Sequence, residues 1–262
     1  YYRAHEEALI NDKRARLQQQ VGEAKTQLAS LTKELEKRIP RQASGFGLQA
    51  IGGGLGNDYI YDPANVTDGK PHYTVASSDG KAWSYFTDGK PAQRYGSKSG
   101  TNNGKWFGDL PKPEHITLGA YTEGDGRARG GDHKGAFAEV LIYGQVLNEE
   151  QRGTLDRYVK ARYHGEGQAP EPPTDGLRFW LDAGDIDANA ETPNPAEGSR
   201  VAAWVDKVTG TALGQAEPAR QPKMSRLGQS PALYFDNSFL LGSIARGRSA
   251  KFLDDQAGTM VV

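Results

Sequence analysis

The first forty residues carry an apolar stripe with heptad spacing, and charged or amide side chains occupy the positions between. The stripe consists of Ile10, Leu17, Val21, Ala24, Leu28, Leu31 and Leu35. Apolar positions that recur every three or four residues predict an α-helix with one apolar face. Pro40 cannot continue a helix and restricts the residue before it. A helical segment is therefore predicted over residues 1–40, with its end near Ile39.

Two roles fit this stripe. The helix could form a coiled coil that oligomerises or docks the chain, or it could be one half of a helical hairpin in a longer protein. Arg14 and Gly22 interrupt the stripe, and about three and a half heptads is close to the shortest stable coiled coil. Both roles require a helical partner for residues 10–35.

From Ser44 the pattern changes to short alternating stretches separated by turn residues. Asp-Gly dipeptides at 68–69, 79–80 and 88–89 are typical of tight turns in β-hairpins. Alternating apolar residues predict strands at 72–76, 81–87 and 115–119. The clearest strand is 137–143. An antiparallel sheet is therefore predicted.

A helix is predicted directly after that strand. Asn148 is a suitable N-cap, and Glu149 and Glu150 suit the first helical turn. The apolar face of this helix would be formed by Leu155, Tyr158, Val159 and Tyr163. The helix is expected to close the β block of residues 44–165 by packing on its sheet.

A proline-rich segment follows the closing helix. Residues 166–175 lack apolar periodicity and read as an extended linker. Beyond it, apolar alternation predicts strands at 176–183, 201–207 and 231–236. The chain thus predicts β structure on both sides of a linker.

These segments resemble a known family. The run 135–143 with 147–150, preceded by the turn 87–90 and the strand 116–119, is similar to the C-terminal half of a concanavalin A-like, laminin-G-like jelly-roll domain. Residues after the linker resemble the opening half of the same domain; they are Leu177–Ala183, Trp204–Lys207 and Leu233–Asp236. The two halves occur in reversed order.

The reversed order has two explanations: tandem jelly rolls, each incompletely represented, or one circularly permuted domain. The linker favours the tandem arrangement, with one laminin-G-like unit at 44–165 and the start of a second at 176–262. The resemblance implies a mainly β, antiparallel jelly-roll sandwich behind an N-terminal coiled-coil-like helix. The expected chain is a segment of a longer protein, because the sequence begins without methionine and stops within an apolar run.

Composition excludes several classes of function. Lys plus Arg (32) nearly balances Asp plus Glu (33), so no net field attracts nucleic acid. The absence of cysteine removes disulfides, Cys-type zinc sites and thiol nucleophiles. No apolar run reaches the roughly 20 residues of a membrane span. The abundance of glycine (33 residues) favours strands and tight turns.

A catalytic role is not expected for this segment. Glucan-cleaving relatives of the fold carry a Glu-x-Asp-x-x-Glu motif, because retaining hydrolysis needs paired carboxylates. That motif is absent, and Glu139 stands alone on its predicted strand. Glu139 is expected to be a structural acid.

An aromatic sugar platform is one candidate site. The loop between the predicted strands contains three rings and two amides, namely Tyr95, Asn102, Asn103, Trp106 and Phe107. Exposed rings pack against the apolar face of a pyranose, while amides bond its hydroxyls. The alternative is that the loop aromatics fold back onto the core.

A calcium site is a second candidate. Asp182, Asp185 and Asp187 cluster at the end of a predicted strand, and calcium favours such oxygen ligands. A second acidic loop contains Glu123, Asp125 and Asp132, but Arg127 and Arg129 disfavour a cation there. The alternative in both places is a solvated turn.

The function expected from the resemblance is non-catalytic recognition, with carbohydrate as the ligand class. The resemblance further implies that the segment belongs to a large multidomain bacterial protein and acts outside the cytoplasm, in the periplasm or at the cell surface. The alternative is a structural or assembly module that contacts other protein domains and binds no small ligand.

Overall fold

The computed structural model describes part of the chain in detail. The described residues are 13–14, 16–27, 30, 47–49, 58–61, 66, 68–92, 94–97, 104–109, 115–122, 128–130, 133–168, 170–243 and 255–262. The backbone alone is described at 47–49, 58–61, 94–97, 121–122, 128–130 and 243. The chain divides into two compact units, Tyr1–Ala43 and Ser44–Val262.

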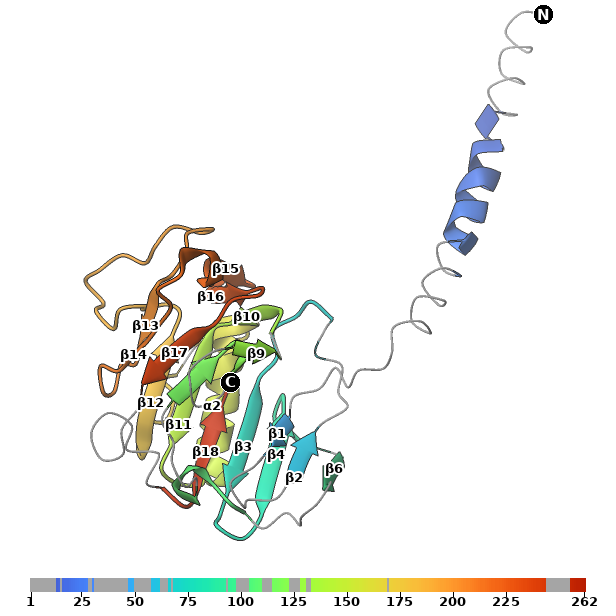
Figure 1. Cartoon of the computed structure of the whole chain (residues 1–262). Coiled ribbons are helices and arrows are strands. Elements are labelled where there is room, and N and C mark those ends of the chain that lie inside the picture. The colour runs from blue at the N-terminus through green and yellow to red at the C-terminus, as the bar shows by residue number, and fades with distance from the viewer. Residues whose placement is uncertain are drawn as a thin grey trace, which may run out of the picture. The chain divides into compact units, whose positions relative to one another are not determined.

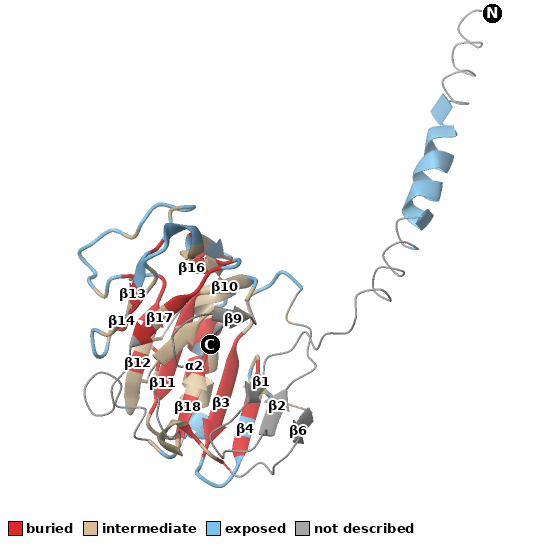
Figure 2. Cartoon of the chain, viewed as in Figure 1, coloured by how far each residue is buried: buried red, intermediate tan, exposed pale blue. Residues whose placement is uncertain are grey.

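The first unit contains the predicted helix. Residues 13–14, 16–27 and 30 are helical and exposed (Figures 1 and 2). Two stripe residues, Leu17 and Val21, are 57% and 53% exposed. None of the described helices is long and apolar enough to cross a membrane.

The second unit is mainly β, with antiparallel pairing throughout its described sheets. The central sheet has the order β12 (Leu177–Asp182), β11 (Glu139–Tyr143), β18 (Gly258–Val261), β3 (Thr74–Ser78), β4 (Trp83–Thr87) and β5 (Lys90–Pro91). A second sheet has the order β13 (Ala203–Val205), β14 (Ala212–Gly214), β17 (Leu240–Ser243) and β7 (His115–Leu118). The prediction of a mainly β, antiparallel fold is confirmed.

Smaller sheets complete the described strands. One contains β10 (Gly135–Phe137), β16 (Ser230–Phe235) and β15 (Lys223–Leu227). Another contains β1 (Gly47–Gln49), β2 (Asp58–Tyr61) and β6 (Arg94–Ser97), and a pair is formed by β8 (Tyr121–Thr122) and β9 (Ala128–Gly130). Short 3-10 helices lie at Phe107–Asp109 and Pro218–Arg220.

The central sheet is covered on both faces, as the buried strands in Figure 2 indicate. On one face, Leu141 and Tyr143 pack with Leu155 and Val159 of α2 (Glu149–Tyr163). On the other face, the second sheet and the β10–β16–β15 sheet cover an apolar cluster that includes Val140, Ile142, Phe179, Leu181, Trp204, Leu213, Leu233 and Phe235. Alternation along β11 supplies one set of side chains to each face.

The helix α2 begins as the sequence predicts. Asn148 accepts a hydrogen bond from the Gln151 N–H at 2.9 Å, and the Gln151 side chain accepts one from the Asn148 N–H at 3.0 Å. This reciprocal capping satisfies two backbone donors that the first helical turn leaves free. The cap fixes where α2 starts over the sheet.

Strands on both sides of residues 166–175 share the same sheets (Figure 1). β12 pairs with β11, and β18 lies between β11 and β3. β10 pairs with β16, and β7 pairs with β17. Because both halves supply strands to each core-forming sheet, neither buries its apolar face alone. Residues 166–175 therefore connect α2 to β12 within one compact unit, instead of separating two β units as expected.

Candidate functional site

The predicted aromatic platform is largely internal. Trp106 is 5% exposed and lies against β18, where a Cβ on Gly258 would come within 2.5 Å of the indole nitrogen. Phe107 is half-buried, lies 4.9 Å from Trp106 between ring centroids, and packs on the core. Both rings therefore fold back onto the core, which is the alternative to an exposed sugar platform. Tyr95 lies in β6, where the backbone alone is described, and Asn102 and Asn103 lie outside the described residues.

Two of the three aspartates predicted to bind calcium contact cationic side chains of the protein itself. Asp182 contacts Arg162 at 2.6 Å and Lys207 at 3.3 Å, and Asp185 contacts Lys207 at 3.2 Å. Asp187 is exposed and accepts a hydrogen bond from the Asn189 N–H. Across the described parts of the chain, no three His, Asp or Glu side chains are grouped to share a metal ion. The geometry is that of an ion-pair network, in place of the expected calcium site.

Two carboxylates of this network face each other across neighbouring strands. Glu139 on β11 is the register partner of Asp182 on β12, and both are more than nine-tenths buried. Arg162 of α2 contacts Glu139 at 2.8 Å and also Asp182, and the Tyr158 hydroxyl donates a hydrogen bond to Glu139. Lys207 lies 4.4 Å from the centroid of the Trp180 ring. We call Glu139, Arg162, Asp182, Asp185 and Lys207 the buried charge cluster.

The protonation of Glu139 is set by its burial. Removal from water raises the pKa of Glu139 to about 7, against the attraction of Arg162, and the negative charge of Asp182 adds to the rise. A carboxyl group that titrates near neutral pH is a candidate acid or base. Here, however, Arg162 and Tyr158 occupy the carboxylate, so the arrangement favours a structural role.

Sequence reasoning missed this cluster. Arg162 and Lys207 lie far along the chain from Glu139, and no local motif links them. The weak signal was a polar residue, Glu139, at an inward position of a strongly apolar strand, which requires a buried partner.

A histidine between two carboxylates lies two residues before β3. The Nδ1 atom of His72 is 2.8 Å from Asp88, and its Nε2 atom is 2.8 Å from Asp68. Burial disfavours the charged ring, but the two hydrogen-bonded carboxylates outweigh it and raise the pKa of His72. This contact fastens the 68–70 turn to the β4–β5 hairpin.

A surface groove lies between α2 and the β4–β5 hairpin. Its volume is about 500 Å³, which is within the range of small-molecule sites. Tyr73, Val75, Phe86 and Pro91 supply its apolar lining. Its charged lining consists of Asp88, Lys90, Glu149, Arg152, Asp156 and Lys160. We call this feature the helix–hairpin groove.

The charged side chains that line the helix–hairpin groove are balanced in number, and several of them contact neighbouring lining residues. The Tyr73 hydroxyl donates to Asp156 at 2.6 Å, and the Lys160 ammonium donates to the same carboxylate at 2.8 Å. Burial opposes ionisation, but the bonds from Lys160 and Tyr73 lower the pKa of Asp156. The guanidinium of Arg152 lies 5.1 Å from the Phe86 ring centroid. Three carboxylates and three cations line the groove. The lining therefore offers hydrogen-bond donors and acceptors to a ligand but carries no net charge.

Comparisons with known proteins give no relative. No protein-family model, curated protein or solved structure matches the chain.

Proposed function

We propose that the β unit is a non-catalytic recognition module of the concanavalin A-like, laminin-G-like jelly-roll type, and that it binds a neutral glycan in the helix–hairpin groove. The observation that carries the proposal is the groove itself. It combines an apolar lining, including Phe86 and Pro91, with a balanced set of donors and acceptors. Sugars present the same combination, an apolar ring face surrounded by hydroxyl groups.

The buried charge cluster supports a non-catalytic role. Retaining glycoside hydrolysis requires one carboxylate free to attack and another free to donate a proton. Glu139 is held by Arg162 and Tyr158, and Asp182 is held by Arg162 and Lys207. By family resemblance, we further propose that the module belongs to a multidomain bacterial protein and acts outside the cytoplasm.

Titration with neutral oligosaccharides tests glycan binding. Isothermal titration calorimetry with cellohexaose, xylohexaose and mannohexaose should give saturable binding for at least one of them. Phe86→Ala removes the exposed part of the ring in the groove, and a loss of about 1.4 kcal/mol corresponds to tenfold weaker binding. We expect a loss of at least that size.

Tyr234→Ala is the matched control for this substitution. Tyr234 is a half-buried aromatic residue on β16, outside the groove lining. The control should bind like the unmodified protein, and circular dichroism should show both variants folded. Stronger binding of a sulfated oligosaccharide than of any neutral one would contradict the charge-balance basis of the proposal.

The alternative function, an assembly module, is favoured by one observation in the first unit. Leu17 and Val21 are large apolar side chains exposed on one helix, and such residues are normally covered by a partner in a coiled coil. If assembly is the function, sedimentation of the chain should show dimers or larger species. Leu17→Asp together with Val21→Asp should then return the protein to monomers, whereas Gln18→Asp and Gln20→Asp should not.

A further inference from the structure

The two ring nitrogens of His72 each face a carboxylate. Nδ1 lies 2.8 Å from Asp88, and Nε2 lies 2.8 Å from Asp68. A neutral imidazole has one N–H, so at this geometry its second nitrogen would set a lone pair against a carboxylate oxygen. The imidazolium has two N–H groups and donates to both carboxylates. The arrangement is therefore that of a protonated His72.

Asp88 links this histidine to the helix–hairpin groove. Its other carboxylate oxygen accepts from the Tyr73 N–H at 3.1 Å, and its own N–H donates to the Tyr73 carbonyl at 3.0 Å. Asp88 also belongs to the groove lining. Its φ of 49° lies in the left-handed region, which costs free energy for a residue with a side chain. The contacts of the Asp88 side chain, including the one to His72, offset this cost.

The 88–89 turn forms part of the groove wall. At Gly89, an added Cβ would lie 3.0 Å from the Tyr73 hydroxyl and 3.1 Å from the Asp156 carboxylate. The turn therefore lies directly against the hydrogen bond that Tyr73 and Asp156 share at 2.6 Å. The two residues that follow the turn also line the groove. A displacement of the turn would change the shape of the groove.

Loss of the His72 proton would weaken this wall. The side chain is 13% exposed, so water replaces little of what a lost hydrogen bond supplied. One ring nitrogen would repel the carboxylate that it faces, and Asp68 and Asp88 would lose the cation between them. Burial opposes the charged ring, but its bonds to Asp88 and Asp68 raise the pKa of His72 above the ordinary 6.5. The contacts are therefore complete at low pH and are lost as pH rises through that pKa.

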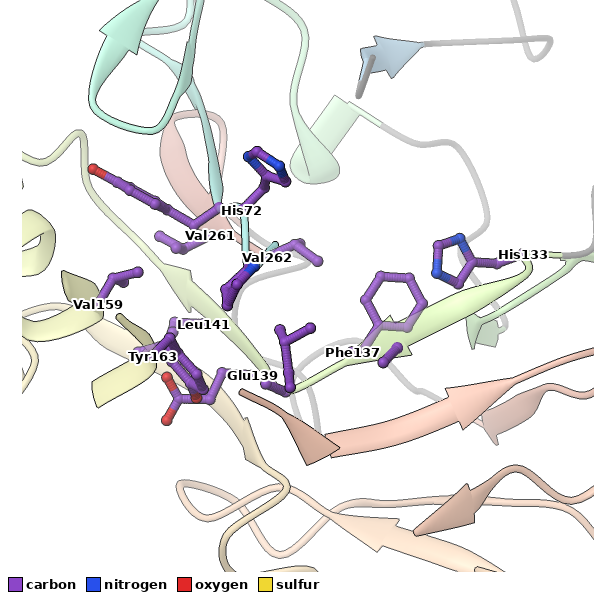
Figure 3. A pocket seen from close by; sticks show the side chains of 14 residues that line it. His72, His133, Phe137, Glu139, Leu141, Val159, Tyr163, Val261 and Val262 are labelled. Carbon is purple, nitrogen blue, oxygen red and sulfur yellow. The ribbon is translucent and has the colours of Figure 1, made fainter. Parts of the chain in front are cut away.

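Other titratable groups near His72 can be separated from it. Lys70 lies 3.9 Å from the Asp68 carboxylate, on the same turn. Glu139 and His133 line one cavity together with His72, but their side chains lie apart from its ring (Figure 3). Burial lowers the pKa of His133 and raises that of Glu139 to about 7. Because Glu139 titrates near neutral pH, its substitution is a necessary control.

Three groups that line the groove keep one charge state between pH 6.5 and 9. Burial opposes ionisation of Asp156, but bonds from Lys160 and Tyr73 lower its pKa. The bond to Asp156 raises the pKa of Lys160, and burial raises that of the Tyr73 hydroxyl. The ordinary pKa values of these groups are 3.8, 10.5 and 10.0, and each shift moves further from the range. These groups therefore do not produce a change of binding within it.

We propose that His72 is a pH-sensitive positioning residue of the helix–hairpin groove: protonated, it holds the 88–89 turn in the form that binds the ligand, and neutral, it releases that turn. Because the regulated site is the groove, this role rests on the glycan binding proposed for it. The affinity for glycan should be highest at low pH and should fall as His72 loses its proton.

Calorimetry and nuclear magnetic resonance of the unmodified protein test this role together. The probe is cellohexaose, xylohexaose or mannohexaose, whichever binds. Above the pKa of His72 the protonated fraction falls about tenfold per pH unit, so the association constant should fall by about fivefold or more from pH 6.5 to 9. The fall should set in at the pH at which the His72 ring resonances titrate in the free protein. Saturating oligosaccharide should in turn move that titration to higher pH, because coupling between two sites is reciprocal.

Substitutions assign the effect to His72. His72→Gln is uncharged at every pH, so it should show the weak binding of the unmodified protein at pH 9 throughout the range. His164→Gln replaces an exposed histidine at the C-terminal cap of α2 and should keep the unmodified profile. Glu139→Gln and His133→Gln should keep it as well, since neither residue lines the groove.

Two results on the unmodified protein would overturn this role, and neither needs His72→Gln to fold. One is an association constant that stays the same across the pH range in which His72 titrates. The other is a His72 titration that saturating oligosaccharide leaves in place. In both cases the glycan site would stand.

Absence of binding by every oligosaccharide at every pH would instead contradict the glycan function. The turn itself is then the readout, because amide relaxation in the free protein reports its order. The order of the Gly89 amide should fall when His72 loses its proton, while that of Ala76 within β3 should not. An unchanged Gly89 amide would overturn the role of His72 independently of any ligand.

Discussion

Replacing Arg162 by methionine should destabilise the β unit by about 3–5 kcal/mol at pH 8, because removing one partner from a buried ion pair leaves uncompensated charge. Arg162 contacts both Glu139 and Asp182, which are 7% and 4% exposed. Methionine retains most of the aliphatic volume, so the loss reports on the charge. Lys207 remains beside Asp182 but makes no described contact with Glu139. The free energy of unfolding from urea titration measures the effect.

Arg157→Met is the matched control for Arg162→Met. Arg157 lies on the exposed side of the same helix, where its guanidinium bonds the Thr154 hydroxyl. Surface interactions of this kind contribute less than about 1 kcal/mol. The Arg162→Met effect should also shrink toward pH 5, since Glu139 then carries a proton. Equal losses for both variants would show that Arg162 acts through helix propensity or packing and not through the buried charge cluster.

Local structure could be read from the sequence where one segment contains all the determinants. Asp88-Gly89 forms the turn between β4 and β5, and both residues adopt the positive φ that such a turn requires. α2 starts after Asn148 because the cap and its partner Gln151 lie within one helical turn. The strand predicted at 137–143 is also present, but it is interrupted at Ala138, so that β10 and β11 belong to different sheets. Apolar alternation alone does not predict such an interruption.

Long-range pairing could not be read from the sequence. The acids on β11 and β12 meet because the register places Glu139 opposite Asp182, and register depends on the whole sheet. The acidic sequence 182–187 looked like a cation site because the pattern shows the carboxylates but not the lysine and arginine that approach them. Trp106 looked available to a ligand for the same reason, since its burial depends on Gly258, which is remote in sequence.

The proline-rich segment shows why composition can mislead about domains. Residues 166–175 have the composition of a linker, yet they join α2, which packs on the central sheet, to β12, which is a strand of that sheet. A connection that passes from a helix to a strand over the surface needs the same extended residues as a linker between domains. A connection within a domain and a linker between domains differ in whether the strands on its two sides pair with each other. That pairing is a property of the whole fold.

The second large effect is the dependence of folding stability on pH that Glu139 causes. The pKa of Glu139 rises from the ordinary 4.5 to about 7 on folding because burial disfavours its charge. Below pH 4.5 the carboxyl group is protonated in both the folded and the unfolded state, so its titration does not change the free energy of unfolding. Between pH 4.5 and 7 the unfolded chain loses this proton while the folded chain keeps it, so stability falls as pH rises. The full loss, reached above pH 7, is about 3 kcal/mol for a shift of this size.

Glu139→Gln should remove this dependence. Glutamine resembles the protonated acid in shape and charge, and it can still bond Tyr158. We expect the unfolding free energy of the unmodified protein to fall by about 3 kcal/mol more than that of the variant between pH 4.5 and 8. Urea titrations across this range give the difference, in which the titration of His72 and other common groups cancels.

Glu150→Gln supplies the control, because Glu150 is exposed on the first turn of α2. Its pH profile should follow that of the unmodified protein. Parallel profiles for Glu139→Gln and the unmodified protein would mean that Glu139 is ionised in the folded state throughout, held by Arg162 despite its burial. The two substitutions in the buried charge cluster therefore test each other. If Glu139 is neutral at pH 5, Arg162→Met should lower the free energy of unfolding less at pH 5 than at pH 8. If Glu139 is ionised throughout, the loss should be the same at both pH values.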